Sequence, residues 1–446
     1  MSNNTFIKKI ESFIESEQLL DKGCKYLVAL SGGADSVCML LVLKDLGYNV
    51  EAVHCNFHLR GNDSDDDENY CRELCEKLNI KLHVEQFDTL SYANTNKISV
   101  EMAARELRYT LFDRLLDEYG YAAVCVAHHI NDNVETVLLN LARGTGVKGL
   151  QGIMPKRGKI IRPMLCVTRT EIEKYMSSQV MTFCHDITNN DDEIIRNGIR
   201  HNIIPQLEKV NSAAIANINK TARRMVAVEQ ILTDFIEDKS KKIIRKNGRH
   251  DIINFCDLNN EYLCYLILKK YGFTSLQAEN IFEYLKTAKP GRIFNSDKYS
   301  LLVDREEIIL KSKDDRQEVG ITVLEAGEYR ISGDETLIFQ NLQDNDISSF
   351  PHTKDYCFAD AGKVKLPLHV RNVRTGDRFI PFGMKNEKLV SDYLTDRKYN
   401  VFEKEEQLIV TDETGKSVWL VGERADESIR VTLETKSVIL LNIRRL

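Results

Sequence analysis

The sequence predicts an α/β fold: a parallel sheet with helices on both faces, followed by a small helical middle domain and a mainly β C-terminal domain. Up to about residue 141, short apolar runs alternate with helix-like patterns. A long helical pattern follows, and β-branched residues in short runs dominate beyond Gly291. Strands that alternate with helices indicate a parallel sheet covered on both faces. A chain of 446 residues also exceeds what one hydrophobic core usually supports.

The first half contains four predicted strands, each followed by a helix. Their short, continuously apolar runs are typical of strands that are buried on both faces. In chain order, the elements are strand 26–30, helix 35–46, strand 49–56, helix 65–78, strand 80–87, helix 99–119, strand 122–127 and helix 132–141. Open parallel sheets bind ligands beyond the carboxyl ends of their strands. We therefore expect functional residues just after Leu30, Asn56 and Ala127.

The second half begins with a long predicted helix and becomes mainly β. The expected helices are 211–246, 257–270, 275–286 and a short one near 389–394, and the expected domains are 1–210, 211–315 and 316–446. Segment 220–249 carries nine Lys or Arg against four Asp or Glu. It is either a solvated helical face or a surface that contacts RNA phosphates. In the second case, the candidate contacts are Lys241, Lys242 and Arg245.

The composition is that of an ordinary globular protein, with 43% hydrophobic and 29% charged residues. The most apolar early run, 37–43, is far shorter than the ~20 residues that cross a membrane, and the N-terminus lacks a secretory pattern. The eleven cysteines are scattered and partly inside apolar patterns, which favours reduced thiols in the cytoplasm. Cys71 and Cys75 fit buried small hydrophobes better than zinc ligands. A net charge of -6 argues against general nucleic-acid coating but permits a local basic patch.

A glycine-rich hexapeptide, Ser31-Gly32-Gly33-Ala34-Asp35-Ser36, lies between the first strand and its helix. Adjacent glycines let the backbone approach an anion closely, and the amides at a helix start attract phosphate. Ser31 and Ser36 can donate hydrogen bonds to phosphate oxygens. Asp35 can hold a Mg²⁺ ion that bridges phosphates, or it can simply favour the helix dipole. The segment matches neither the Walker A loop nor Gly-x-Gly-x-x-Gly.

A second polar segment, 127–136, follows the fourth strand. His128, Asp132 and Glu135 are spaced by four and three residues and can share one face of a turn. A histidine beside carboxylates at this sheet edge can act as a general base and bind a cation. The alternative is helix capping, in which Asn131 or Asp132 caps the helix and Glu135 completes a capping box.

Basic residues complete the candidate site. Arg105 and Arg108 lie three apart on helix 99–119 and can pair with phosphate in a way that lysine cannot. Surface ion pairs with Glu101 and Glu106 are the alternative. The further candidates for substrate or RNA contact are Arg143, Arg196, Asn197 and Arg200.

Taken together, these segments resemble the tRNA(Ile)-lysidine synthetases of the ATP pyrophosphatase, or PP-loop, superfamily. The resemblance covers nearly the whole chain, is densest over 31–207 and returns at 376–379 and 388–394. It implies an adenine-nucleotide α-hydrolase-like fold for the first domain. The chain departs from the usual pattern at His58, one position later than in many members, and at Asn400, where proline is expected.

The resemblance implies a cytoplasmic ligase that uses ATP and Mg²⁺ to join L-lysine to C2 of the wobble cytidine, position 34, in the CAU anticodon of tRNA(Ile). AMP and pyrophosphate leave, and codon recognition changes from AUG to AUA. The resemblance implies that 31–36 binds ATP, that Asp35 faces the metal and that Arg105 faces phosphate. It assigns the lysine amine to Asp132 and His128, with Glu135 beside them. The middle and C-terminal domains would bind tRNA, and a homodimer is left open.

Three other classes of protein compete with this interpretation. A PP-loop tRNA thiolase usually needs paired cysteines or an iron–sulfur site, and the sequence contains no Cys-x-x-Cys. An amidating ligase would need a glutaminase domain, which the β-rich C-terminal region does not supply. A non-catalytic RNA- or nucleotide-binding relative could keep the glycine loop but would have no need for His128, Asp132 and Arg105.

Overall fold

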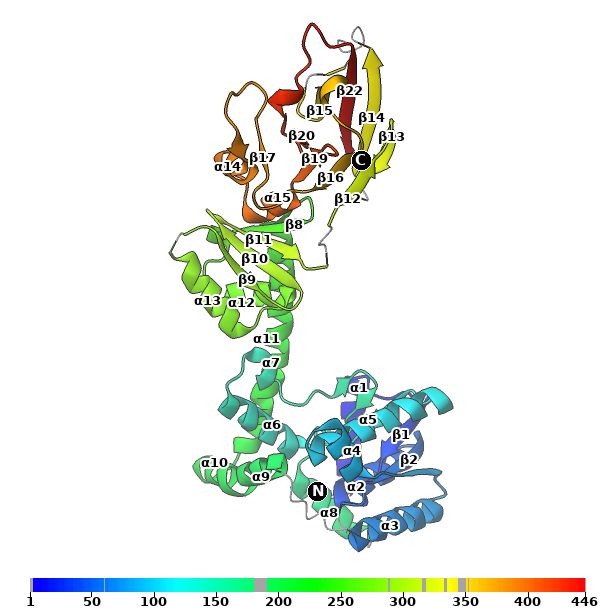
Figure 1. Ribbon diagram of the computed structural model, residues 1–446. Helices are drawn as coiled ribbons and strands as arrows, with labels where there is room; N and C mark the ends of the chain where they lie inside the picture. Colours follow the sequence, from blue (N-terminus) through cyan, green and yellow to red (C-terminus); the bar gives the residue numbers. More distant parts are fainter. Residues whose placement is uncertain are drawn as a thin grey trace. The chain divides into compact units, whose positions relative to one another are not determined.

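The computed structural model describes residues 3–59, 61–179, 191–287, 289–314, 318–332, 335–343, 350–351 and 353–445. The chain divides into two compact units, Met1–Thr233 and Asp234–Leu446. Helix α11 (Ala214–Ile243) runs through the boundary between them (Figure 1). The three domains expected from the sequence stay a prediction.

The first unit is built on a six-stranded sheet in the order β3-β2-β1-β4-β6-β5. Every neighbouring pair is parallel except β5 with β6. The strands are β1 (Lys25–Ala29), β2 (Asn49–Asn56), β3 (Leu82–Gln86), β4 (Ala123–Cys125), β5 (Lys156–Arg157) and β6 (Ile160–Ile161). The parallel sheet predicted from the sequence is therefore confirmed. From β1 the chain moves first to one side of the sheet and later to the other, so a ligand site is expected where β1 and β4 end.

Helices cover both faces of this sheet. Successive strand residues point to opposite faces: Tyr26 and Val28 join one apolar cluster, and Leu27 between them joins another. Helix α2 is buried all round from Ser36 to Leu43, as expected of a helix enclosed by other elements. The first cluster packs under α1 (Asn3–Ser16), α2 (Ala34–Asp45), α3 (Asn62–Leu78) and α8 (Arg169–Ser178), and the second under α5 (Val100–Tyr119).

Shorter helices connect these layers. Six helices of this unit, α1, α4, α7, α8, α9 and α10, lie where the sequence analysis predicted none. The remaining helices of the unit are α4 (Thr89–Asn96), α6 (Ile130–Arg143), α7 (Val147–Leu150), α9 (Asp191–Gly198), a π-helical turn η1 (Ile199–Ile203) and α10 (Ile204–Val210).

The second unit starts with the end of α11 and combines helices with an antiparallel sheet. The expected helices are present as α12 (Glu261–Leu268) and α13 (Ser275–Leu285). Helix α11 ends three residues earlier than predicted because the chain turns into β7, which pairs with β8. The sheet has the order β7-β8-β11-β10-β9, with β7 (Ile244–Asn247), β8 (His250–Asn254), β9 (Arg292–Asn295), β10 (Tyr299–Asp304) and β11 (Glu307–Ser312).

The C-terminal region is mainly β, as predicted. Two antiparallel sheets, β12-β16-β19-β20-β21 and β13-β14-β22-β15, share a core that contains Trp419 and Phe339. The expected short helix is α14 (Val390–Asp396), and Asn400, which replaces the expected proline, caps α15 (Val401–Glu406) through its side chain. The strands are β12 (Gly320–Val323), β13 (Gly327–Arg330), β14 (Glu335–Gln343), β15 (Tyr356–Asp360), β16 (Leu368–Asn372), β17 (Arg378–Phe379), β18 (Lys388–Leu389), β19 (Leu408–Thr411), β20 (Ser417–Leu420), β21 (Arg424–Ala425) and β22 (Ser437–Arg445).

Candidate active site

The glycine loop forms the turn between β1 and α2, at the predicted edge of the sheet. Gly32 has a φ of +90°, a conformation that L side chains rarely adopt. Gly33 is the N-cap of α2; its own N–H donates to Ser31 Oγ at 3.4 Å, and no cap side chain accepts a hydrogen bond from the amides that follow it. The amides at this helix start are therefore available to an anion, which the helix dipole also favours.

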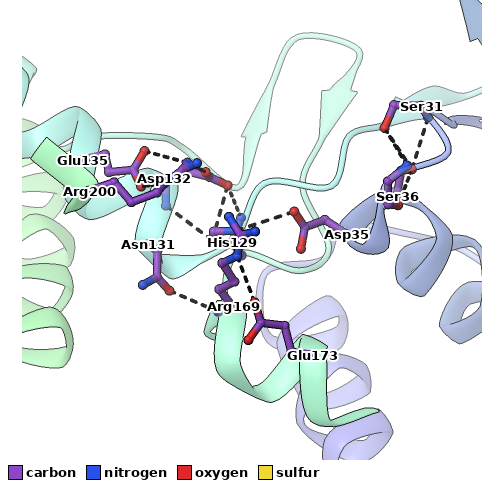
Figure 2. A network of polar contacts seen from close by, with 11 residues as sticks. Ser31, Asp35, Ser36, His129, Asn131, Asp132, Glu135, Arg169, Glu173 and Arg200 are labelled. Atoms are coloured by element: carbon purple, nitrogen blue, oxygen red, sulfur yellow. Dashed lines mark hydrogen bonds and ion pairs between the residues drawn. The ribbon is translucent and has the colours of Figure 1, made fainter. Parts of the chain in front are cut away.

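The two serines of the loop contact each other. Their Oγ atoms lie 3.1 Å apart, and Ser36 Oγ donates to Gly33 O at 3.0 Å (Figure 2). Ser36 is buried, whereas Ser31 is exposed. We expected both hydroxyls to face phosphate. The structure gives Ser36 the task of holding the turn and leaves Ser31 on the open side.

Asp35 points from the first turn of α2 toward the segment after β4 (Figure 2). Its Oδ2 lies 3.8 Å from Nε2 of His129, and 37% of its side chain is exposed. Burial raises the pKa of Asp35, while His129 opposes this rise. The carboxylate therefore lies beside the loop in a partly desolvated position with few partners.

His129, rather than Asn131 or Asp132, caps α6. Its Nδ1 accepts a hydrogen bond from Asp132 N–H at 3.4 Å, and Asp132 Oδ2 accepts one from His129 N–H at 2.8 Å. This is the capping box that the sequence analysis kept as an alternative, but it is built by different residues. Asp132 still keeps 22% of its side chain exposed.

Glu135 and Arg200 form the second half of the network. Arg200 Nε and Nη2 donate to the two Glu135 oxygens at 2.7 and 3.1 Å, and Nη2 lies 3.7 Å from Asp132 Oδ1 (Figure 2). Glu135 is almost completely buried. Arg200 belongs to the π-helical turn η1, a local geometry that often occurs at functional sites. Asp132 and Glu135 thus share a face, as predicted.

His128 lies outside this face. It precedes α6, and its Nδ1 accepts a hydrogen bond from Arg162 Nε at 3.2 Å. Burial, together with positive neighbours, first Arg162 and also Arg196 and Arg105, lowers the pKa of His128 to about 3. The expected face of three residues is therefore wrong for His128, which is a neutral imidazole and a weak base here.

The two buried groups next to the loop have shifted pKa values in opposite directions. Burial raises the pKa of Asp132, although the His129 N–H and Arg200 oppose the rise. Burial lowers the pKa of His129, although Asp35 and Glu135 oppose the fall. Carboxylic acids with raised pKa values close to a positive group are typical of sites that move protons.

The other predicted basic residues surround the network less closely. Arg105 lies over the Tyr109 ring, 5.0 Å from its centroid, and Arg108 lies over Phe57 at 5.2 Å, near the end of β2. The other three candidates are Arg143, which ends α6, Arg196, which is exposed on α9, and Asn197, which is half-buried.

The three RNA candidates on the second unit differ in their surroundings. Lys241 pairs with Asp238 at 3.6 Å, and Arg245 pairs with Glu307. Lys242 is exposed on the last turn of α11. Two of the three charges are thus partly compensated within the protein.

The sequence analysis did not select His129 or Arg162 as site residues. His129 has a signal in hindsight, because it lies three residues before Asp132, the spacing of a capping box. Arg162 is buried and bridges His128 and Met154 O, at 2.9 Å from the latter. No spacing rule connects Arg162 to His128, since they follow different strands.

Among the residues the structure describes, no helix is long and apolar enough to cross a membrane. All ten cysteines in the described ranges are free thiols.

A Gly-Gly loop opening an uncapped helix at the switch point of a parallel sheet is the geometry of a PP-loop ATP-binding domain. In agreement, the sequence model of the PP-loop domain matches residues 2–207. That of the TilS substrate binding domain matches residues 251–313.

Full-length relatives carry the identification further. A tRNA(Ile)-lysidine synthase of Parabacteroides distasonis is 41% identical, covering 98% of this chain and 99% of the relative. One of Bacteroides thetaiotaomicron is 38% identical, with the same coverage. One of Clostridium perfringens is 32% identical, again over 98% and 99%. This chain belongs to the tRNA(Ile)-lysidine synthase family and is an enzyme of the ligase type.

Proposed function

We propose that this chain joins L-lysine to C2 of the wobble cytidine in the CAU anticodon of tRNA(Ile), converting ATP to AMP and pyrophosphate. One observation carries the proposal. Asp35, in the phosphate loop, and Asp132, on α6, lie on two sides of the same buried imidazole of His129. A site that must activate a base with ATP and then deliver an amine needs these two functions side by side.

In the first step, the cytosine C2 oxygen attacks the α-phosphorus of ATP and pyrophosphate leaves. The leaving group gains negative charge, so it needs preorganised donors. The free amides at the start of α2 supply them, and Gly32 allows the close approach of the backbone. Arg105 is a further candidate, because its charge reaches the His128 neighbourhood from α5. The target base lies in a single-stranded loop and can be turned out of its stack.

Mg²⁺ fits Asp35 as a ligand. The residue is partly exposed, its Oδ2 lies 3.8 Å from the imidazole of His129, and it lies in the first turn of the phosphate-binding helix. Proteins commonly hold Mg²⁺ with one or two carboxylates plus substrate phosphates rather than with a full protein cage. When bound there, the ion would neutralise charge on the phosphates as pyrophosphate departs.

In the second step, the lysine ε-amine attacks C2 and AMP leaves with the former C2 oxygen. The amine must lose a proton first, since its unperturbed pKa is about 10.4. Asp132 is the better acceptor of that proton: its pKa is raised by burial, and part of its side chain is open. Glu135 already holds the Arg200 guanidinium through two hydrogen bonds, so its role is to orient.

His128 takes a different role from the one the sequence suggested. Its Nδ1 is occupied by Arg162, so the neutral ring carries its proton on Nε2 and can only donate from there. We propose that it donates to a phosphate or base oxygen, while Asp132 accepts the proton. This division follows the rule that groups with opposite pKa shifts divide acid and base work.

The wider setting is part of the same proposal. The middle and C-terminal domains, with the expected bounds 211–315 and 316–446, bind tRNA, and the enzyme works in the cytoplasm, where tRNA and ATP are present. The sequence leaves a homodimer open, and light scattering of the tRNA-free protein would decide it.

The test is mass analysis of a tRNA transcript with a CAU anticodon after incubation with the protein, ATP, Mg²⁺ and L-lysine. We expect the anticodon cytidine to gain one lysine, and no gain when ATP or lysine is omitted. A matched transcript with a GAU anticodon is the control. ATP consumption without any change in tRNA mass would contradict the proposal.

A further inference from the structure

The residue that caps α6 is unusual for its task. Serine, threonine, aspartate and asparagine are the preferred N-caps, and other helices of this protein use them: Asp88 caps α4, Ser99 caps α5 and Thr168 caps α8. At α6 the cap is His129. Capping needs only one acceptor, so it does not explain why an imidazole stands here.

The second ring nitrogen of His129 supplies the explanation. Because Nδ1 accepts the Asp132 N–H, the neutral ring must carry its proton on Nε2. That proton points toward Asp35 Oδ2, 3.8 Å from Nε2. This distance is longer than a hydrogen bond, but contacts at catalytic sites often shorten when substrates bind. Only 2% of the His129 side chain is exposed, so packing fixes the ring in this orientation.

We propose that His129 is a positioning residue that couples the ATP site to the lysine site. Its Nδ1 edge fixes the start of α6 and with it Asp132, and its Nε2–H orients the Asp35 carboxylate toward the metal and phosphates. A short capping side chain would fix the start of α6 but could not orient the Asp35 carboxylate. This inference rests on the proposed function, because it assigns Asp35 to ATP and Asp132 to lysine.

Two conservative variants separate the two tasks. The amide of Asn occupies a place close to that of Nδ1, and the longer Gln amide reaches toward that of Nε2. His129→Asn should therefore keep the cap and no longer reach Asp35. His129→Gln should weaken the cap and keep a donor toward Asp35. Thr274→Asn, which exchanges one capping side chain for another on the remote helix α13, is the control for cap exchange.

The decisive readout is calorimetric titration of ATP with and without Mg²⁺, beside the melting temperature of each variant. In His129→Asn, we expect an unchanged melting temperature and a Mg²⁺-dependent gain in ATP affinity that is about 10- to 100-fold smaller, the usual effect of removing a hydrogen bond to a metal-binding carboxylate. His129→Gln should show a lower melting temperature and keep most of the gain. An unchanged gain in His129→Asn would overturn the inference and make His129 a cap only. Since this titration needs no tRNA, it can support His129 even if the lysidine assay fails.

Discussion

Two polar networks lie at opposite edges of the same sheet, and they treat their carboxylates in opposite ways. At the carboxyl edge, burial raises the pKa values of Asp35 and Asp132. Near the amino edge, burial alone would raise the pKa of Glu51, but hydrogen bonds from Lys25, Tyr121 and His83 lower it to about 2. Lys25 Nζ lies 2.6 Å and His83 Nε2 3.1 Å from the Glu51 oxygens.

The contrast separates a stabilising network from a reactive one. A carboxylate whose hydrogen bonds outweigh the cost of burial favours the folded state, whereas one whose pKa burial raises despite its partners costs stability and gains reactivity. We propose that the fold uses the amino edge to hold β1, β2 and β3 together, and the carboxyl edge for chemistry. Substitutions at either edge can test this division.

The largest effect is expected for Asp132→Asn. Lysidine formation should fall by about 10²- to 10⁴-fold, the usual effect of losing a general base. Asparagine keeps an oxygen that can accept the His129 N–H, so the capping box survives. Mass analysis of tRNA measures the activity, and thermal unfolding measures stability. Near-normal turnover in this variant would show that Asp132 does not receive the proton.

Glu51→Gln should have the converse effect: it should lower stability and leave activity nearly unchanged. The variant loses a charge that Lys25, Tyr121 and His83 all contact, and stability should fall by about 2 kcal/mol. Turnover of the folded variant should stay within about twofold, because Glu51 is remote from the loop. Urea unfolding and the lysidine assay together measure this. Lost activity at full stability would abolish the distinction between the two edges.

The pH dependence of stability should have opposite signs at the two edges. The folded pKa of Glu51 is depressed to about 2 from 4.5, so its contribution is full above pH 4.5 and is lost as the pH falls toward 2. The difference in folding stability between wild type and Glu51→Gln should therefore shrink as the pH falls through this range. Asp132 has a raised folded pKa, so its ionisation costs stability above that pKa. The Asp132→Asn variant should accordingly gain most in folding stability, relative to wild type, at neutral pH.

The smallest effect is expected on the second unit. Neutralising Lys241, Lys242 and Arg245 to glutamine should weaken tRNA binding and make the dependence of affinity on salt less steep, by about 0.7–0.9 for each phosphate that is no longer neutralised. Lys241 and Arg245 already pair with acidic residues, so we expect Lys242 to account for most of the change.

Lys159→Gln, on an exposed lysine of the first unit that pairs with Asp117, is the matched control. Filter binding across a salt series measures the affinities. Equal affinities and equal slopes in the triple variant and the control would make segment 220–249 a solvated face only.

The sequence predicted the sheet and the glycine loop well because both depend on local patterns. The apolar runs at 26–30 and 49–56 indicate strands, and the complete hexapeptide 31–36 after the first of them, rather than its glycine pair alone, indicates a phosphate turn. The face with Asp132 and Glu135 was also predictable, since helical spacing places them together.

Other features depend on contacts between distant segments. The spacing of His128 suggested a shared helical face, but α6 begins only at Ile130, and Arg162 from another strand holds the ring. The pairing of Arg200 with Glu135 depends on a π-helical turn, and no residue pattern in the sequence predicts that turn. The role of His129 depends on Asp35, which is distant in the sequence and close only in the folded sheet.

The central claim is that the carboxyl edge of this sheet lets ATP capture a nucleobase oxygen and then lets an amine replace it. The most direct measurement follows one atom: a tRNA whose anticodon cytidine carries ¹⁸O at C2, incubated with ATP, Mg²⁺ and L-lysine. The account predicts that ¹⁸O appears in the phosphate of the released AMP as lysidine forms. Unlabelled AMP, with ¹⁸O retained in the tRNA or lost to water, would contradict it.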